Sequence, residues 1–374
     1  MNKLLPLLLL LLLPTLALAQ SAPPPAVAAR SWLLVDHASG QTIAAEKADE
    51  RIEPASLTKL MTAYLAFAAL RQKALAPSQA VPVSERAWRA AGSRMFIEPK
   101  TPVTVDELLR GMIVQSGNDA CIALAEAVAG TEDAFVQNMN REAQRLGMTA
   151  THFANSTGLP DAQHYSTAAD LARLASALIR DFPEYYALYA IREYRYNNIS
   201  QPNRNRLLWI DPNVDGVKTG HTENAGYCLI ASAKRGERRL VSVVLGAASD
   251  SVRAIESQKL LNYGFQYFDT VRLYEKGQQL STVEVWKGAD GKVKAGFDRA
   301  LYVTVPKGES DKVKASLVSH QPLIAPVSRG QQVATLKLAI DGRPLADFPV
   351  TALEAVAVAG PLGRAWDTLR LWFK

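Results

Sequence analysis

Ser56 and Lys59 stand three residues apart at the start of an apolar segment. In a helix this spacing puts the hydroxyl and the amine on one face, within reach of each other. A serine becomes a nucleophile beside a base, and a lysine acts as that base only when burial or a like charge keeps it neutral. Residues 56–70 are apolar on nearly every side, which predicts a buried helix. The pair therefore indicates acyl transfer, although a helix cap beside a solvated lysine gives the same letters.

Two further motifs follow at regular distances. Ser116-Gly117-Asn118 comes about 60 residues after Ser56, in a glycine-containing loop before a helix. Lys218-Thr219-Gly220 comes about 100 residues later, immediately before an expected strand at residues 225–233. Ser-x-x-Lys, Ser-Asp-Asn and Lys-Thr-Gly are together the signature of class A β-lactamases and penicillin-binding proteins. Order, spacing and context agree with that signature.

The segments around these motifs resemble one family along essentially the whole chain that follows residue 19. The family is the low-molecular-mass penicillin-binding proteins that act as serine-type D-alanyl-D-alanine carboxypeptidases. The resemblance implies a penicillin-recognising domain, a β domain and a membrane-associating terminal helix. It is carried by Pro54–Thr62, Gly92–Phe96, Gln115–Cys121, Asn155–Leu159, Asp215–Thr222 and Ala325–Val327.

This resemblance assigns roles to the motif residues. Ser56 is expected to be the acylated nucleophile and Lys59 its base. Ser116 is expected to relay a proton to the leaving amine, and Asn118 to hold the substrate amide. Lys218 is expected to keep Lys59 neutral by its charge and to attract the substrate carboxylate.

Substrate binding is expected in the same region. Thr219, with Gly220 beside it in the motif, would bind the substrate carboxylate. The backbone N–H groups of Ser56 and His221 would form the oxyanion hole. Arg204 and Arg253 resemble positions that support carboxylate recognition, or else they make ordinary ion pairs.

Other chemistries are excluded by what the chain lacks. The middle motif reads Ser-Gly-Asn, and no Glu-x-x-Leu-Asn lies between Asn118 and Lys218. A class A β-lactamase needs such a glutamate to aim its deacylating water. The five histidines are far apart, so we expect no zinc site and no cofactor. The net charge of +6 is scattered, so nucleic acid is not an expected partner.

The first residues indicate export. Lys3, the leucine-rich run 4–13 and the small-x-small signal at residues 17–19 form a secretory signal peptide. The run is short for a spanning helix, although an uncleaved anchor is the alternative. Residues 1–19 are therefore left out of the fold, and residues 20–29 are an extended leader. We expect the protein on the periplasmic side of a bacterial inner membrane.

The chain length of 374 residues predicts two domains. Residues 30–268 predict an α+β domain in which strands at both ends form one antiparallel sheet against a helical cluster. Residues 269–355 predict a small all-β domain. Cys121 and Cys228 both lie in apolar runs, so two buried free thiols are expected instead of one bridge. The expected helices are 105–112, 118–128, 133–146, 168–179 and 252–268, and the expected strands are 31–35, 42–45, 225–233 and 239–247.

The tail at residues 361–374 predicts an amphipathic helix. An apolar stripe combines Leu362, Ala365, Trp366, Leu369, Trp372 and Phe373, and cations lie opposite. The segment is too short to span a bilayer, so we expect it to lie in the lipid interface. Docking of the stripe on the protein's own β domain is the alternative.

These features together predict removal of the terminal D-alanine from a peptidoglycan pentapeptide, with covalent binding of β-lactams. A D,D-endopeptidase that cuts cross-links is the nearest rival. A wall-binding morphogenetic protein with incidental turnover is the rival from another class. Ser56, Lys59 and Lys218 are all present, which argues against an inactive scaffold.

Overall fold

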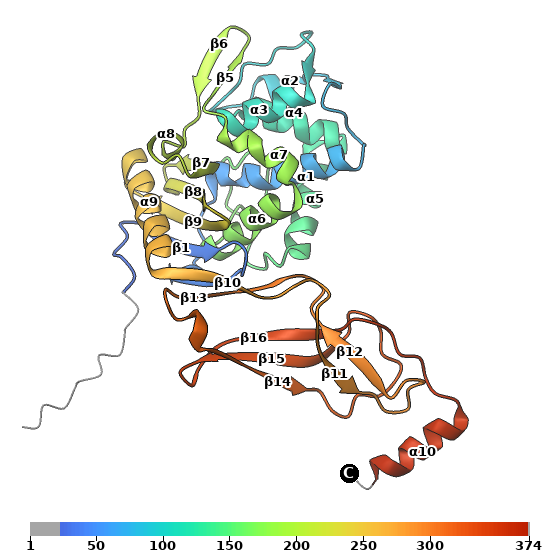
Figure 1. The fold of residues 1–374 in the computed structure, drawn as a ribbon. Helices are drawn as coiled ribbons and strands as arrows, with labels where there is room; N and C mark the ends of the chain where they lie inside the picture. The colour runs from blue at the N-terminus through green and yellow to red at the C-terminus, as the bar shows by residue number, and fades with distance from the viewer. Residues whose placement is uncertain (1–22, 373–374) are drawn as a thin grey trace, which may run out of the picture.

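The computed structural model describes residues 23–372, so the predicted signal peptide at residues 1–19 lies outside the described residues. The chain folds into three parts (Figure 1). Residues 31–267 carry the three predicted motifs and are called the catalytic part, residues 268–352 are called the β part, and a terminal helix follows. A five-stranded antiparallel sheet in the order β2-β1-β9-β8-β7 organises the catalytic part. Strands from the beginning and the end of the catalytic part's sequence lie side by side, as predicted, because β1 pairs with β9. The strands are β1 Ser31–Asp36, β2 Thr42–Glu46, β7 Val214–Thr222, β8 Gly226–Arg235 and β9 Arg238–Ala247.

The sheet is covered on both faces. Side chains alternate across a strand, so Leu33 and Val35 join the core with the main helical cluster. Trp32 and Leu34 join a second core with α9. Both faces are therefore shielded from solvent, and a central strand such as β1 is buried at every position.

The helices begin at the polar caps that the sequence offers. Thr104 and Glu107 form a capping box, and the hydroxyl of Thr167 accepts from the N–H of Asp170, at the spacing that predicted a helix start there. Helix α1 is buried on nearly all sides, as expected. The helices are α1 Lys59–Arg71, α2 Glu85–Trp88, α3 Val105–Val114, α4 Asn118–Ala129, α5 Glu132–Arg145, α6 Ala168–Asp181, α7 Pro183–Tyr186, α8 Leu207–Ile210 and α9 Asp250–Tyr267.

Three local predictions were incomplete. The Lys-Thr-Gly segment precedes strand β8, as predicted, but it also lies within a strand of its own, β7, which was not predicted. Ser56 lies in a 3-10 turn, η1 (Ala55–Thr58), and the α-helix begins only at Lys59. A hairpin of β5 Glu193–Tyr196 and β6 Ile199–Pro202, which was not predicted, rises beside the catalytic helices (Figure 1).

The remaining short elements are β3 Ala80–Val81, β4 Val103–Thr104 and η2 Ala187–Ala190. Cys121 and Cys228 are free and buried, as predicted.

The β part contains two sheets around a valine-rich core. β10 Phe268–Tyr274 pairs with β13 Leu301–Pro306, and five further strands form a sheet in the order β11-β12-β16-β15-β14. Asp36 accepts hydrogen bonds from Arg238 and Thr270, so a buried carboxylate joins the catalytic sheet to β10. The other elements are β11 Gln279–Glu284, β12 Lys292–Gly296, η3 Ser310–Lys312, β14 Val313–Ser319, β15 Gln332–Ile340 and β16 Arg343–Ala352.

Helix α10 (Pro361–Leu371) lies at the end of the β part away from the catalytic part (Figure 1). Proline occupies its first turn, which suits the fixed φ of that residue. Within residues 23–372 no helix combines the length and the apolar character needed to cross a bilayer.

Candidate active site

The predicted nucleophile, Ser56, and its predicted base, Lys59, meet at the junction of η1 and α1. The Nζ atom of Lys59 donates to Oγ of Ser56 over 3.1 Å, as the spacing of three residues predicts. The same amine donates to Oδ1 of Asn118 over 2.6 Å and to the carbonyl oxygen of Thr157 over 2.5 Å. Lys59 is 1% exposed. Three acceptors therefore fix a buried amine beside the hydroxyl.

The backbone around Ser56 has little free space. Ala55 has a φ of 47°, a left-handed conformation that a residue with a side chain rarely adopts. Gly158 has a φ of 83°, and a Cβ atom there would lie 1.8 Å from the carbonyl oxygen of Ala55. A Cβ on Gly220 would lie 3.1 Å from the carbonyl oxygen of Pro54. The loop carrying Gly158 and strand β7 thus enclose the serine turn from two sides.

Ser116 and Lys218 form a second hydroxyl–amine pair. Nζ of Lys218 donates to Oγ of Ser116 over 3.0 Å and to the carbonyl oxygen of Thr219 over 3.1 Å. Both side chains are buried. Ser116 has a φ of 69°, which the turn before α4 imposes. Asn118, the first residue of α4, donates from Nδ2 to the carbonyl oxygen of Ala91 over 2.6 Å.

Burial favours the neutral form of both lysines, the form that can accept a proton. Desolvation, aided by the positive charge of Arg204, lowers the pKa of Lys59 to about 8. Desolvation also lowers the pKa of Lys218 well below its ordinary value, with the charges of Lys59, Arg204 and Arg253 as further causes. Burial, and not the charge of Lys218, is thus the main cause that favours a neutral Lys59, so proton transfer from a serine hydroxyl to this amine is available near neutral pH.

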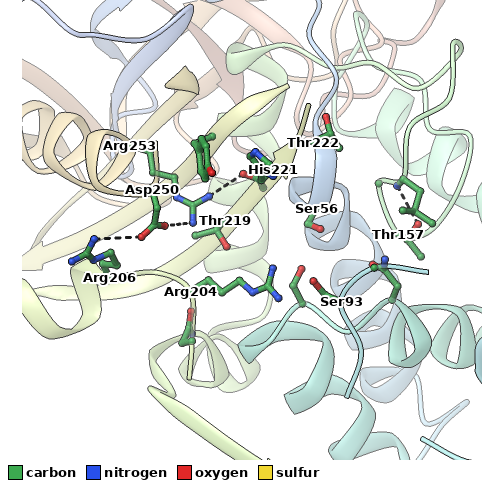
Figure 2. A pocket seen from close by; sticks show the side chains of 18 of the residues that line it. Ser56, Ser93, Thr157, Arg204, Arg206, Thr219, His221, Thr222, Asp250 and Arg253 are labelled. Carbon is green, nitrogen blue, oxygen red and sulfur yellow. Dashed lines mark hydrogen bonds and ion pairs between the residues drawn. The ribbon is translucent and has the colours of Figure 1, made fainter. Parts of the chain in front are cut away.

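The residues predicted for substrate binding line a cavity of about 580 Å³ that opens on Ser56. Figure 2 shows Ser56, Ser93 and Thr219 around one space, with Arg204 extending toward it. His221 is exposed, and its ring packs on that of Tyr227 with centroids 4.1 Å apart.

Arg253 occupies a different position from Arg204. It is buried and donates to the carbonyl oxygens of Gly220 and Cys228 over 3.0 and 3.3 Å, and it pairs with Asp250. Its hydrogen bonds therefore hold strand β7 at Gly220 (Figure 2). The ordinary ion pair that the sequence left open is present here, beside the cavity wall.

Sequence reasoning missed two supports of the site. Oδ1 of Asn155 accepts from the backbone N–H groups of Thr157 and Gly158 over 3.1 and 2.7 Å, which turns the Thr157 carbonyl toward Lys59. The carboxylate of Asp119 accepts from three successive backbone N–H groups at residues 95–97. An asparagine two residues before the loop turn was the available signal for the first support.

Within residues 23–372 no group of three or more His, Cys, Asp or Glu side chains could hold a metal ion. The fold and this geometry, with a buried lysine amine against a serine hydroxyl, fit the class of serine acyl-transfer enzymes. Two family models divide the chain in the same way. One, described as D-alanyl-D-alanine carboxypeptidase, matches residues 18–249. The other, the C-terminal domain of penicillin-binding protein 5, matches residues 268–358.

Known proteins resemble the chain over nearly its whole length. D-alanyl-D-alanine carboxypeptidase DacC of Escherichia coli is 44% identical over 365 residues, which is 96% of this chain and 91% of that protein. Penicillin-binding protein 5 from Haemophilus influenzae aligns with a TM-score of 0.84 at 40% identity, over 90% of this chain and 99% of that one. Penicillin-binding protein D2 from Listeria monocytogenes, solved in an ampicillin-bound form, aligns with a TM-score of 0.60 at 31% identity, over 65% of this chain and 99% of that one.

The chain therefore belongs to the D-alanyl-D-alanine carboxypeptidase family. It is a serine-type hydrolase of the penicillin-binding class with an α+β domain and a C-terminal all-β domain, in agreement with the prediction from its motifs.

Proposed function

We propose that the protein removes the terminal D-alanine from peptidoglycan pentapeptides through an acyl-enzyme on Ser56. The observation that carries this proposal is the buried amine of Lys59, 3.1 Å from Oγ of Ser56 and with a pKa lowered to about 8. A neutral lysine in that position accepts the serine proton as the hydroxyl attacks a carbonyl carbon.

The acylation step uses the two hydroxyl–amine pairs in turn. Oγ of Ser56 bonds to the carbonyl carbon of the penultimate D-alanine, and its proton passes to Lys59. The N–H groups of Ser56 and His221 stabilise the oxyanion. When the C–N bond breaks, the terminal D-alanine leaves as an amine that takes a proton from Ser116, which Lys218 hydrogen-bonds. Ser116 regains a proton, the one that Lys59 took from Ser56, so both groups return to their starting states. Water then hydrolyses the ester, releasing a tetrapeptide acid and restoring the Ser56 hydroxyl.

Recognition of the substrate carboxylate is assigned to the wall opposite the helices. Thr219 and Arg204 line the cavity there, and Arg253 supports them from behind through the carbonyl oxygen of Gly220. Asn118 is assigned the substrate amide, because it lines the cavity and its Oδ1 atom accepts from Lys59.

One experiment separates this activity from that of an endopeptidase. The protein truncated after Gly360 is incubated with a muramyl pentapeptide and, separately, with a cross-linked muropeptide dimer, and the products are identified by mass. Loss of one alanine from the pentapeptide supports the proposal. Cleavage of the dimer with an unchanged pentapeptide would replace it by the endopeptidase reading.

We also propose that α10 attaches the exported protein to the periplasmic surface of the inner membrane. The apolar side chains of Leu362, Trp366 and Trp372 are 88%, 65% and 84% exposed. The opposite side of the helix faces the β part, where the carboxylate of Asp367 accepts from the N–H of Lys287 over 2.7 Å. The helix thus contacts the protein through polar atoms and exposes Leu362, Trp366, Leu369 and Trp372, the arrangement that suits a lipid interface. Of the other residues of the predicted stripe, Ala365 lines a cleft toward the β part, and Phe373 lies outside the described residues.

This arrangement changes the expected role of one cation. Arg370 is one of the cations on the side opposite the apolar stripe, and it lies over the ring of Trp286 at 5.2 Å and pairs with Asp367 at 3.6 Å instead of standing free to contact lipid. The alternative in which the apolar stripe docks on the β part does not fit these contacts.

A further inference from the structure

A cleft separates helix α10 from the β part. It has a volume of about 450 Å³ and lies between the segment at Lys287, the segment at Ala325 and the first turns of the helix. Two of its lining side chains are cationic, Lys287 and Arg364, and no acidic side chain lines it. The other lining residues are Val358, Pro361, Ala365 and Thr368.

Neither cation has a side-chain partner among residues 23–372. The backbone N–H of Lys287 donates to Asp367 and its carbonyl accepts from Ala359, so the main chain is fixed while the amine stays free. Two nearby cations are paired, since Lys294 pairs with Glu354 and Arg370 with Asp367. Lys287 and Arg364 are thus the cations of the cleft that can bind an anion.

The N-terminal end of helix α10 adds partial positive charge to the cleft. Gly360 caps α10 without a side-chain hydrogen bond, and Arg364 is in the second turn. First-turn N–H groups of a helix lack intrahelical partners and carry partial positive charge. The cleft thus offers an anion two free cations beside an uncapped helix end.

The position of the cleft relative to the apolar stripe indicates which anion would reach it. Trp366 and Leu369 point away from the protein, whereas Lys287 belongs to the β part on the other side of the helix. An interfacial helix buries its apolar face about 5–10 Å into the boundary between headgroups and acyl chains. In that pose its flank lies at the level of the lipid phosphates.

We propose that this cleft binds the phosphate headgroup of an anionic phospholipid through Lys287 and Arg364. The proposal rests on the membrane attachment proposed above. It goes further, because it gives the β part a lipid contact of its own through Lys287, in addition to the apolar side chains of α10. Asp367 is a positioning residue here, since its hydrogen bond to Lys287 holds the two sides of the cleft together.

The test uses the full exported chain and sedimentation with vesicles of phosphatidylcholine alone or with phosphatidylglycerol added. Lys287→Gln/Arg364→Gln is compared with Lys307→Gln/Arg343→Gln. The control pair removes the same two side-chain types at exposed positions away from α10. The backbone N–H of Lys307 donates to the carbonyl oxygen of Tyr267 at the end of α9, and Arg343 is the first residue of β16. Penicillin labelling of Ser56 checks that each variant is folded.

The expected result is a gain in affinity of the wild-type chain when phosphatidylglycerol is added, which the cleft variant loses by roughly ten- to thirtyfold at low salt. Its binding to phosphatidylcholine alone and the binding of the control variant stay unchanged. Equal affinity of the cleft variant and the wild type for phosphatidylglycerol vesicles would overturn the headgroup site while leaving the anchor intact. A wild-type chain that sediments with neither vesicle would refute the membrane attachment itself, and the site with it.

Discussion

Nζ of Lys59 lies 2.6 Å from Oδ1 of Asn118, so the base on α1 is held by the first residue of α4. The carbonyl oxygen of Thr157 holds the same amine from a third segment. The position of the base therefore depends on three parts of the chain that are far apart in sequence, and the distance of 3.1 Å to Ser56 follows from their packing.

Lys59→Arg is expected to abolish acylation while the protein still folds. A guanidinium keeps its proton in proteins, so it cannot accept the proton of Ser56. We expect the rate constant for penicillin acylation to fall by about 10²–10⁴-fold, the usual contribution of a general base. Stopped-flow or gel labelling measures this rate. Lys218→Arg, which keeps the charge beside Ser116, should lose less, and a Lys59→Arg enzyme as fast as the wild type would remove Lys59 from the mechanism.

Acylation is also expected to depend on pH in a defined direction. The base is active when it has lost its proton, and burial lowers the pKa of Lys59 to about 8. The rate constant should therefore rise about tenfold per pH unit below pH 8 and level off above it. The measurement is the penicillin acylation rate from pH 5.5 to 9.5. A rate that is flat or falls across this range would contradict a lysine base with that pKa.

Penicillin is expected to label Ser56 and to stay bound for minutes or longer. The β-lactam ring amide takes the place of the scissile bond, and the sequence has no glutamate at the position that aims water in class A β-lactamases. Peptide mapping of the labelled protein locates the adduct, and Ser56→Ala is the matched unlabelled protein. Label on another residue, or rapid turnover of penicillin, is the outcome that this reading cannot accommodate.

The spacing of the motifs predicted which residues meet in the site better than it predicted the strands and loops around them. Ser56 and Lys59 meet because three residues are close to one helical turn, a local relation that sequence reveals. The meeting of Lys218 with Ser116 is a tertiary contact, known beforehand only through the family resemblance. Strand β7 was missed because Gly216 and Gly220 weaken the apolar alternation by which strands are recognised.

Backbone carbonyls and loop turns were beyond the sequence for a different reason. Every residue has a carbonyl, so nothing in the letters distinguishes that of Thr157 as a partner of Lys59. The β5–β6 hairpin was missed because its strands are four residues each and polar on both sides. Cys121 and Cys228, by contrast, were placed correctly because an apolar run predicts burial wherever the chain folds.

Gly158→Ala is expected to destroy the site, and Gly147→Ala is its control. Both glycines have positive φ values, 83° and 76°, so alanine costs about 1–2 kcal/mol at either position. A Cβ on Gly147 meets nothing within 4 Å, whereas on Gly158 it would overlap the backbone of Ala55. We expect normal acylation with slightly reduced stability for Gly147→Ala, and loss of acylation for Gly158→Ala. Thermal unfolding and penicillin labelling measure the two effects, and equal labelling of both variants would show that the loop does not shape the serine turn.

Truncation after Gly360 is expected to release the protein from the inner membrane, because it removes the exposed apolar stripe while leaving the catalytic and β parts complete. A subtler variant, Trp366→Ser/Leu369→Ser, should have the same effect, since these side chains are 65% and 56% exposed on one face of α10. Trp209→Ser is the matched control, because Trp209 is 48% exposed on α8 in the catalytic part and its loss should not change the distribution. Cell fractionation followed by penicillin labelling measures where each protein lies and whether it is active. If the truncated protein still pellets with the inner membrane as fully as the intact chain, α10 is not the anchor, and attachment must come from another surface.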